Sequence, residues 1–573
     1  MTPDSEKAHF AELDALWAKN WPAGVPRALN YPHGRVPLFS YITQWARLDP
    51  ERAAVNYYGS VWTYAQYDAM SDKVAALLAA HGVRKGDRVA IMMQNCPQYQ
   101  FVFYGILKLG AVYTAVSPMS KSFELSHQLR DSGARVIVAQ DQVMDLVREA
   151  REAGLVDTVF VTSLAETLPE NPAVPIHPSI PRTRIECADA IDLLPALDAT
   201  GRDYPDNAVG LDDLAALNYT GGTTGLPKGC MHTHGNMLYT ASSSRSLFER
   251  GDKVETTLVF FPQFWIAGEN ASLIGPLLNG ETVVLLARWD PAAILDAIQK
   301  FKVAQLTLPV DSAIEIIELP ELDTYDLSSL TAVRVLGLIT KLTIELRREW
   351  EKKIGVTLIE SSWGMTETHA FDSFTMGMQN DDFDLKQTRT FVGLPVSGTR
   401  FKIADFETGE TLPIGQQGEL CCLSPSATKG YWQKPEASAD LIRDGWIHTG
   451  DLGFIGESGH IHYLGRRKEM IKVRGMSVFP AEIETILAMH PAVDSSAVAP
   501  RPDTHKGQVP VAFVKLAAEA DAAELERWCA ERLAVFKVPE VRIVDDFPMT
   551  GTGKIKKQVL AERLAAESKD AAA

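Results

Sequence analysis

Segments with helical and strand patterns alternate along this chain from about residue 39, and this alternation limits the possible folds more than any other feature. A helical segment, MSDKVAALLAAHGV, ends near Gly82 and precedes a buried strand pattern, DRVAIMM. A second helical segment, FVFYGILKLG, ends at Gly110 and precedes a second strand, ARVIVAQ. Helices that join successive strands favour parallel pairing, so the sequence predicts an α/β domain with a largely parallel sheet. The pattern resumes with TLVFFP, ETVVLLA and AQLTLP and continues to about residue 390.

The chain changes character toward its C-terminus. Residues 391–465 contain short strand patterns separated by glycine-containing turns, which predict a β-rich subdomain. After these come a helix, PAEIETILAMH, a strand, VPVAFVKL, a second helix, ELERWCAERLA, and a second strand, VRIVDD, which predict a compact α+β unit. We therefore expect a large N-terminal domain, 1–465, and a small C-terminal domain, 466–573.

Three segments lie outside this alternation. Residues 5–19 have the pattern of a short amphipathic helix, and the Pro- and Gly-containing residues 22–37 are expected to wrap the first domain as an arm. Residues 164–212 are rich in Pro, Asp and Thr and are expected to form a long surface connection.

The composition excludes several functional classes. With 56 Lys and Arg against 73 Asp and Glu, the net charge is −17, which disfavours non-specific binding to nucleic acid or anionic membranes. The six cysteines show neither CxxC pairs nor metal-ligand spacing, and Cys421 and Cys422 are typical of a buried strand, as in a reducing compartment. The N-terminus lacks the apolar region of a secretory signal, and no apolar run has the length of a transmembrane helix. We expect a cytoplasmic protein.

A loop rich in glycine and threonine, TGGTTGLPK, runs from Thr220 to Lys228 after a strand pattern, LAALNYT. Successive glycines let backbone N–H groups point inward around an anion, and hydroxyls and a lysine add donors. A Walker A loop is disfavoured because Gly229 and Cys230 follow the lysine where a Ser or Thr is needed. From the loop alone, a polar turn beside an exposed lysine stays an alternative.

Five further motifs follow the loop: SSWGMTET (361–368), GYWQKPEA (430–437), GWIHTGDLG (445–453), GRRKEMIKVRGMSVFPAEIE (465–484) and PMTGTGKIKK (548–557). In order and spacing, these motifs resemble the adenylate-forming superfamily of acyl-CoA synthetases, luciferases and peptide-synthetase adenylation domains. The resemblance covers the chain from about residue 39 to 557. It implies an acid–CoA ligase in which a carboxylate attacks the α-phosphorus of ATP, pyrophosphate leaves, and coenzyme A then takes the acyl group from the adenylate.

The resemblance also implies roles for individual residues. Loop residues would hold the β- and γ-phosphates, Trp363 would stack on adenine beside Gly364, and Thr366 would contact the phosphates. Glu367 would coordinate Mg²⁺ through ATP, and Asp451 and Arg466 would bind the ribose. The loop residues concerned are Thr220, Gly221, Gly222, Thr223, Thr224, Gly225 and Lys228.

The final motif and the segment after residue 465 imply a mobile C-terminal domain. Lys554 matches the catalytic lysine, whose cation would lie against the carboxylate and the α-phosphate. Lys468 occupies the hinge about which the small domain rotates between the two half-reactions. Lys472, as a catalytic residue, and Gly475 belong to the segment that enters the site for thioester formation. A solvated turn and a flexible surface lysine are the alternatives for these positions.

The chain departs from the family pattern around the acyl pocket. Trp265 stands where many relatives have histidine, and Leu338 and Ile339 replace small residues in the segment 338–341. Because packed interiors leave few voids, these side chains predict a shortened pocket for a short- or medium-chain or compact aromatic acid. Glu269, with His369 and Asp372, is a candidate polar group near that pocket, although each could be structural. Gly221 replaces a serine that is common in the family.

Other interpretations stay open at this point. The acyl group could pass to a carrier protein, the acid could be a long-chain fatty acid, or the fold could bind nucleotide without turnover. A P-loop ATPase or kinase is more distant. The sequence predicts ATP, Mg²⁺, coenzyme A and a carboxylic acid as ligands, no nucleic acid, and a homodimer as one possible assembly. His232, His234 and His448 are predicted to be structural, without a metal cluster.

Overall fold

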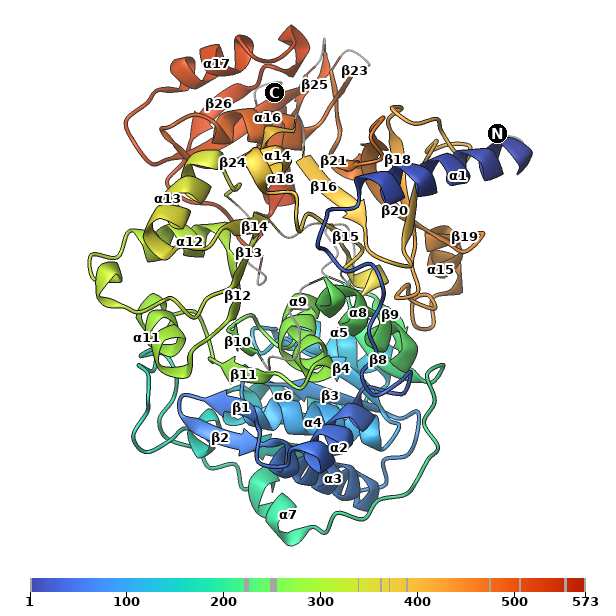
Figure 1. Cartoon of the computed structure of the whole chain (residues 1–573), viewed down its shortest axis with the longest axis vertical. Coiled ribbons are helices and arrows are strands. Elements are labelled where there is room, and N and C mark those ends of the chain that lie inside the picture. The colour runs from blue at the N-terminus through green and yellow to red at the C-terminus, as the bar shows by residue number, and fades with distance from the viewer. Residues whose placement is uncertain are drawn as a thin grey trace.

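Two α/β layers form the larger part of the molecule (Figure 1). The computed structural model describes residues 3–220, 226–247, 255–337, 340–360, 363–369, 371–387, 390–473, 476–503, 506–550 and 554–570. The first sheet has the strand order β7-β6-β5-β3-β4-β8-β9, with every pair parallel except β8 and β9. Its strands are β3 (Arg88–Met92), β4 (Val112–Ala115), β5 (Val136–Gln140), β6 (Thr158–Thr162), β7 (Ile191–Asp192), β8 (Leu214–Tyr219) and β9 (Gly229–Thr233).

The second sheet has the order β14-β13-β12-β10-β11-β1-β2, and all its pairs are parallel except the β1–β2 hairpin. One hydrophobic core joins the two sheets around helix α4, whose residues are all buried. The predicted α/β class is therefore confirmed. The strands are β1 (Ala53–Tyr57), β2 (Ser60–Thr63), β10 (Thr256–Val259), β11 (Thr282–Leu285), β12 (Gln305–Pro309), β13 (Ala332–Leu336) and β14 (Leu358–Glu360).

Helices cover both sheets and connect their strands. Proline at the first position of α4 suits a helix start, because the N–H it lacks would have no partner there. The helices of this part are α2 (Phe39–Leu48), α3 (Tyr64–Ala80), α4 (Pro97–Lys108), α5 (Ser122–Ser132), α6 (Met144–Glu152), α7 (Leu193–Ala199), α8 (His234–Ser246), α9 (Ile266–Glu269), α10 (Gly275–Leu278), α11 (Pro291–Phe301), α12 (Val310–Ile317) and α13 (Ile344–Ile354).

A third, antiparallel sheet follows, with the order β15-β16-β21-β20-β18-β17 and β19 beside β20. Helix α1 (Pro3–Asn20) lies against it (Figure 1), where the indole N–H of Trp17 donates to the Gly459 carbonyl at 2.8 Å. The elements are β15 (Ser373–Phe374), α14 (Phe383–Lys386), β16 (Thr390–Pro395), β17 (Arg400–Ala404), β18 (Gly418–Leu423), α15 (Pro435–Leu441), β19 (Ile442–Arg443), β20 (Trp446–Ile455) and β21 (Ile461–Arg466).

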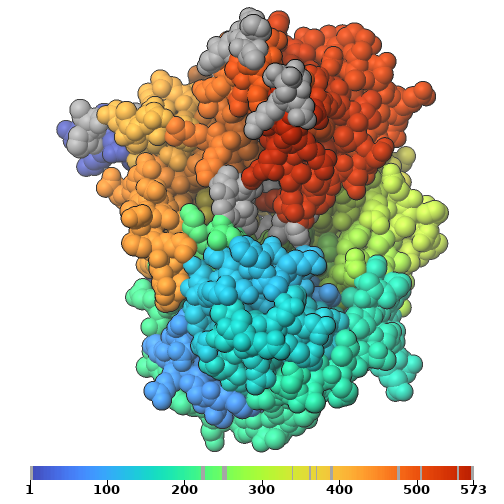
Figure 2. Space-filling view, turned by 180° about the vertical axis from the view of Figure 1, so that it is seen from behind, coloured from blue at the N-terminus to red at the C-terminus, as the bar shows by residue number. Residues whose placement is uncertain are grey.

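The C-terminal unit has its own sheet, in the order β23-β22-β25-β24 with β26 beside β25, and its own core around Ile483 and Val514. Seen from behind, a hollow separates it from the part of the chain, coloured cyan, that carries α5 and α6 (Figure 2). The large N-terminal and small C-terminal parts are thus as expected. The elements are β22 (Ile471–Val473), β23 (Met476–Val478), α16 (Pro480–Ala488), β24 (Val493–Asp503), β25 (Gly507–Leu516), α17 (Ala522–Ala530), β26 (Glu540–Ile543) and α18 (Lys557–Asp570).

One expectation needs correction. Residues 164–212 were expected to form only a surface connection, but they contain strand β7 and helix α7. Leu193 and Leu197 of α7 are buried in the main core, so part of this segment is structural rather than a solvated link. No helix within the described ranges has the length and apolar character needed to cross a membrane.

Candidate functional site

The hairpin of β8 and β9 positions the two ends of the glycine–threonine loop. The N–H of Thr220 donates to the Lys228 carbonyl at 3.0 Å, and the Lys228 N–H donates to the Thr220 hydroxyl at 3.3 Å. A Cβ on Gly229 would lie 3.2 Å from the Tyr219 ring, so glycine lets the strands approach here. Gly221, Gly222, Thr223, Thr224 and Gly225 lie outside the described residues.

A second motif segment lies alongside β9. The Met231 N–H donates to the Gly430 carbonyl at 2.9 Å, and the Trp432 N–H donates to the Gly229 carbonyl at 2.8 Å. This pairing brings Tyr431 to the end of the loop, where the Lys228 ammonium lies 4.5 Å from the centre of its ring.

Tyr431 also links the loop to the SSWGMTET motif. Its hydroxyl donates to Glu367 Oε1 at 2.7 Å, so Lys228, Tyr431 and Glu367 form one contiguous group. The half-buried Glu367 carboxylate can accept several more contacts, because each oxygen has two lone pairs. A carboxylate with an oxygen to spare beside a lysine suits Mg²⁺ bound with polyphosphate, and Glu367 would be its ligand.

Asp131 fastens this group to helix α5. Its two carboxylate oxygens accept from the Tyr219 hydroxyl at 2.9 Å and from the Lys434 ammonium at 2.6 Å. One carboxylate thus joins α5, the end of β8 and the segment that carries Tyr431. Neither Asp131 nor Tyr431 was singled out from the sequence, because both act through contacts between distant segments.

A second group forms where β20 and β21 pair. Asp451 and Arg466 are register partners, with Arg466 Nε 3.2 Å from Asp451 Oδ1. The Trp363 indole N–H donates to Asp451 Oδ2 at 2.9 Å. Burial raises the pKa of Asp451 to about 6, although Arg466 and Trp363 oppose this shift. The group offers a buried carboxylate next to a half-exposed guanidinium, as a ribose would require.

Trp363 is enclosed more than a stacking platform in an open site would be. Its side chain is 8% exposed and packs at an angle of 76° against Phe401. The adenine-stacking role therefore stays a prediction, while the contact that the structure adds is the hydrogen bond to Asp451. Gly364 is exposed and Thr366 is half-buried in the same segment.

The turn before Asp451 is held by Glu419. Its carboxylate accepts from the Gly450 N–H at 2.9 Å and lies 2.7 Å from His448 Nδ1, which is 3.5 Å from the Cys421 sulfur. These three side chains could in principle hold a metal ion, a grouping not expected from the sequence, where His448 was predicted to be structural. Their hydrogen bonds indicate a support for the turn, in agreement with that prediction.

Lys554 of the C-terminal unit lies close to the Asp451 group. It closes a turn in which its N–H donates to the Thr550 hydroxyl at 3.0 Å and its carbonyl accepts from the Thr550 N–H at 2.7 Å. Surrounding protein atoms and the charge of Arg466 lower the pKa of Lys554, while Asp451 and Glu469 oppose this. The side chain keeps contact with solvent, so these neighbours enclose an accessible cation rather than a core residue.

The other predicted residues of the C-terminal unit are described by their own contacts and exposure. Lys472 is exposed on β22, and its N–H donates to the Gln508 side chain at 2.8 Å. Lys468 is exposed in the 3-10 turn Arg467–Glu469, and Gly475 lies outside the described residues. The Lys557 ammonium lies 2.7 Å from Glu484 and 3.5 Å from Glu469, which ties the lysine turn to this unit.

The acyl-pocket candidates centre on helix α9. Trp265 precedes the helix, is half-buried against the main core, and its carbonyl accepts from the Glu269 N–H at 2.7 Å. Glu269 is buried, and its Oε1 lies 3.2 Å from His369 Nε2. Asp372 is also buried, and burial raises its pKa to about 7. Leu338 and Ile339 lie outside the described residues.

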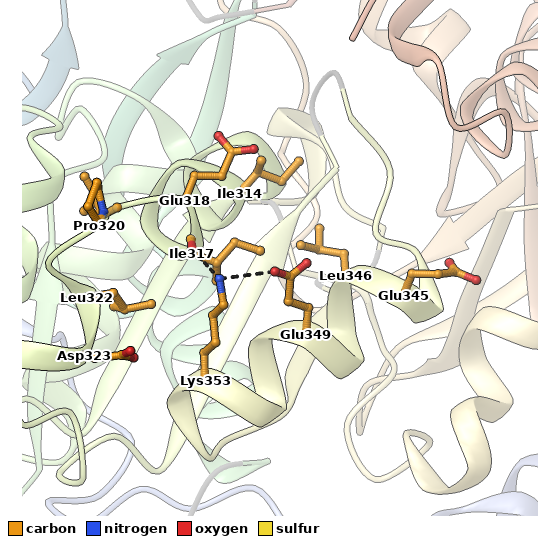
Figure 3. A pocket seen from close by; sticks show the side chains of 11 residues that line it. Ile314, Ile317, Glu318, Pro320, Leu322, Asp323, Glu345, Leu346, Glu349 and Lys353 are labelled. Atoms are coloured by element: carbon orange, nitrogen blue, oxygen red, sulfur yellow. Dashed lines mark hydrogen bonds and ion pairs between the residues drawn. The ribbon is translucent and has the colours of Figure 1, made fainter. Parts of the chain in front are cut away.

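A separate cavity of about 540 Å³ opens between α12 and α13 (Figure 3). Lys353 crosses it, donating to the Ile317 carbonyl at 2.6 Å and lying 3.2 Å from Glu349. None of the predicted site residues within the described ranges lines this cavity, so it lies apart from the two groups that would bind the nucleotide.

Known proteins match the chain over most of its length. The family described as AMP-binding enzyme matches residues 42–432, and the AMP-binding enzyme C-terminal domain matches residues 482–554. A long-chain-fatty-acid–CoA ligase of Bacillus subtilis (strain 168) is 33% identical over 95% of this chain and 97% of its own. A 4-coumarate–CoA ligase 3 of Oryza sativa subsp. japonica is 31% identical over 90% of this chain and 89% of its own.

Solved structures agree with these matches. ATP-bound MatB from Rhodopseudomonas palustris has a TM-score of 0.80 at 27% identity, covering 92% of this chain and 98% of its own. o-Succinylbenzoate CoA synthetase from Bacillus subtilis, in complex with its acyl-adenylate intermediate, has a TM-score of 0.75 at 27% identity, covering 91% of this chain and 97% of its own.

Proposed function

We propose a substrate class and residue roles for this chain, which belongs to the AMP-binding enzyme family and is an ATP-dependent, AMP-forming acid–CoA ligase. Its substrates are a carboxylic acid, ATP and coenzyme A, with Mg²⁺ as the metal ion. We propose that the acid is short- or medium-chain, or compact and aromatic. The observation that carries this proposal is Trp265, an indole half-buried against the main core at the start of α9.

In the first half-reaction, the enzyme must bind the negatively charged phosphates and carboxylate close together and then stabilise the charge of the transition state. Lys228 and Thr220 would hold the β- and γ-phosphates together with loop residues 221–225, and Asp451 and Arg466 would bind the ribose. Lys554 would place its cation between the acid carboxylate and the α-phosphate, where charge concentrates in the transition state. The charges of Arg466 and Asp451 both influence the pKa of Lys554, which supports a position of Lys554 next to this pair.

The second half-reaction would use the other face of the small domain. We propose domain limits of 1–465 and 466–573, with a hinge at Lys468, so that rotation exchanges Lys554 for Lys472 and Gly475. The exposure of Lys472 on β22 supports two alternating arrangements. A cytoplasmic location and a homodimer stay predictions.

The test is acid-dependent formation of AMP and pyrophosphate, with and without coenzyme A, over short, medium, long and aromatic carboxylates. We expect turnover that requires both one acid class and coenzyme A. Lys554→Ala should lower adenylation at least a hundredfold, because it removes the charge that stabilises the transition state. Lys556→Ala is the matched control, since Lys556 is an exposed lysine of the same motif.

Three other outcomes of this assay would contradict parts of the proposal. Fastest turnover of a C16 acid would overturn the short pocket and favour a long-chain fatty acid, the substrate named for the Bacillus subtilis relative. Acyl-adenylate that persists in the presence of coenzyme A would favour a carrier protein as acceptor. No stimulation by any acid would contradict the assigned substrate class altogether.

A further inference from the structure

A group of buried polar side chains lies between β9, α9 and the SSWGMTET segment. Glu269 is 1% exposed and His369 is 0% exposed, with Glu269 Oε1 3.2 Å from His369 Nε2. Asn270 holds this arrangement, because its side-chain N–H donates to the His369 carbonyl at 2.8 Å. The His232 ring packs edge-on against His369 at 4.7 Å, and Asn218 lies 3.3 Å from His232 Nδ1.

Two polar atoms of this group, His369 Nδ1 and the side-chain oxygen of Asn270, lack a hydrogen-bond partner within the described part of the chain, whereas Glu269 Oε1 and His369 Nε2 lie within 3.2 Å of each other. A buried polar group without a partner costs on the order of 1–3 kcal/mol. Native proteins leave few such groups unsatisfied, so the two together indicate that another molecule completes them.

His369 reaches this position through an unusual backbone. Its φ is +57°, in the left-handed region that is uncommon for residues other than glycine, although histidine, asparagine and aspartate adopt it more often than the rest. This conformation follows directly after the 3-10 turn Thr366–Thr368 and turns the chain so that the imidazole meets Glu269. The surrounding contacts therefore hold a strained residue to keep the imidazole in the group.

The group is also close to the reacting atoms. His369 follows Glu367 by two residues, and Asn218 precedes Thr220 by two, so each Cα lies within about 7 Å of a proposed nucleotide contact. Glu269 is linked to Trp265 through the first turn of α9, by an N–H to carbonyl hydrogen bond of 2.7 Å. The group therefore lies next to Trp265 along the chain and near the proposed nucleotide contacts.

We propose that Glu269, His369 and Asn270 form a polar subsite that binds a hydroxyl group on the acid substrate, at its end away from the reacting carboxylate. This inference rests on the proposed acid–CoA ligase with a short pocket. A hydroxyl group both donates and accepts, and so can satisfy a carboxyl oxygen and an imidazole or amide atom at once.

The electrostatics favour an uncharged partner. Burial raises the pKa of Glu269 to about 8, so its carboxyl group is protonated at neutral pH and offers one donor and an acceptor. A substrate ammonium or carboxylate would have to lose its hydration without a fixed counter-charge, which is costly in a buried site. Hydroxylated acids are therefore selected over both plain and charged ones.

The test compares matched acids on the full-length enzyme by AMP formation with coenzyme A. Suitable pairs are benzoate with 3- and 4-hydroxybenzoate, cinnamate with 4-hydroxycinnamate, and hexanoate with 6-hydroxyhexanoate. We expect the best hydroxylated acid to exceed its plain partner at least tenfold in kcat/KM, because omission of the hydroxyl leaves the buried groups unpaired. Equal or better use of every plain acid by the wild-type enzyme would overturn the subsite without any variant.

Two substitutions at one position sharpen the test. Glu269→Leu should remove the preference by lowering kcat/KM for the hydroxylated acid more than for its plain partner, whereas Glu269→Gln should keep most of the preference, since an amide also donates and accepts. A Glu269→Leu enzyme that folds, by an unchanged melting temperature, but slows both partners equally would contradict the proposal. If no acid is activated by the wild-type enzyme, the proposed substrate class has failed. If plain acids are activated without preference, only the subsite has failed.

Discussion

At the scale of single residues, the ionisation of Asp451 determines whether the predicted ribose site can accept hydrogen bonds. Burial raises the pKa of this carboxyl group to about 6, so it gains a proton as the pH falls from 7 to 5. Protonation removes an acceptor and the partner of Arg466, and we expect the KM for ATP to rise about tenfold between these pH values. Steady-state kinetics with ATP as the varied substrate would measure this.

Asp451→Asn provides the control for this dependence. The variant should have a raised KM for ATP at both pH values, and any slope that it retains belongs to the nucleotide's own phosphates. A wild-type KM that stays constant from pH 7 to 5 would show that the carboxylate is not needed in its charged form.

Trp265 sets a second prediction at this scale. Its replacement by alanine removes an indole that is half-buried against the main core, and the vacated volume is available to a longer acyl chain. We expect Trp265→Ala to raise kcat/KM for a C12 acid at least tenfold relative to a C6 acid. Trp289→Ala is a matched control, because Trp289 is a half-buried indole on the same core and lies outside α9. An identical chain-length profile in both variants would contradict the proposed role of Trp265.

At the scale of elements, the β8–β9 hairpin depends on Asp131 for its position. Asp131 accepts hydrogen bonds from Tyr219, at the end of β8, and from Lys434, in the segment that carries Tyr431. If the glycine–threonine loop holds the phosphates as proposed, Asp131→Ala should raise the KM for ATP about three- to tenfold, as expected for a partly buried charge pair worth about 1 kcal/mol. We expect kcat to change less.

A surface pair of the same kind provides the control. Asp157 pairs with Arg135 on the same sheet, but both side chains are exposed, so Asp157→Ala should leave the kinetics unchanged. If the two variants behave alike, the bridge made by Asp131 does not position the loop.

The elements also show what the sequence can predict. The helix at Pro480–Ala488 and the strand at Arg88–Met92 were expected from their apolar patterns. The spacing of apolar residues along a short segment is enough to predict such an element, because it depends only on neighbouring residues. The short helix α7, which buries Leu193 and Leu197, was missed because the surrounding Pro- and Asp-rich residues are typical of a surface link.

The candidate site, like the fold, could be predicted only in part from the sequence. Lys228, Glu367, Asp451 and Arg466 were identified from motifs, and the structure gathers them into two neighbouring groups. The hydrogen bond from Tyr431 to Glu367 could not be predicted, because it depends on the pairing of β9 with a segment far along the chain. The buried partners of Glu269 were likewise hidden, since no local pattern brings β9, α9 and the residue after Thr368 together.

At the scale of the whole molecule, buried acids make the free energy of unfolding depend on pH. The pKa of Glu269 is raised to about 8 in the folded state and returns to an ordinary value of 4.5 on unfolding. The folded state therefore binds more protons between these values, and its stability falls as the pH rises toward 8. Buried histidines act in the opposite direction only in acid, because burial lowers the pKa of His234 to about 4.

This leads to a prediction between pH 6.5 and 7.5. The wild-type protein should lose about 1 kcal/mol more stability across this interval than Glu269→Gln, in which the titrating group is absent. Urea unfolding of both proteins without ligands, at several pH values, would measure the difference. Parallel curves would indicate that Glu269 is already ionised in the folded protein.

The ion pairs of Lys557 couple the position of Lys554 to the rest of the C-terminal unit. They join the start of α18, just after Lys554, to helix α16 through Glu484 and to the 3-10 turn Arg467–Glu469 through Glu469. If the unit rotates about Lys468 as proposed, Lys554 moves with it, and no separate event is needed to withdraw its cation. The proposed adenylate would then lack the cation that would help pyrophosphate to attack it, so the rotation itself would protect the forward path when the thiol of coenzyme A arrives.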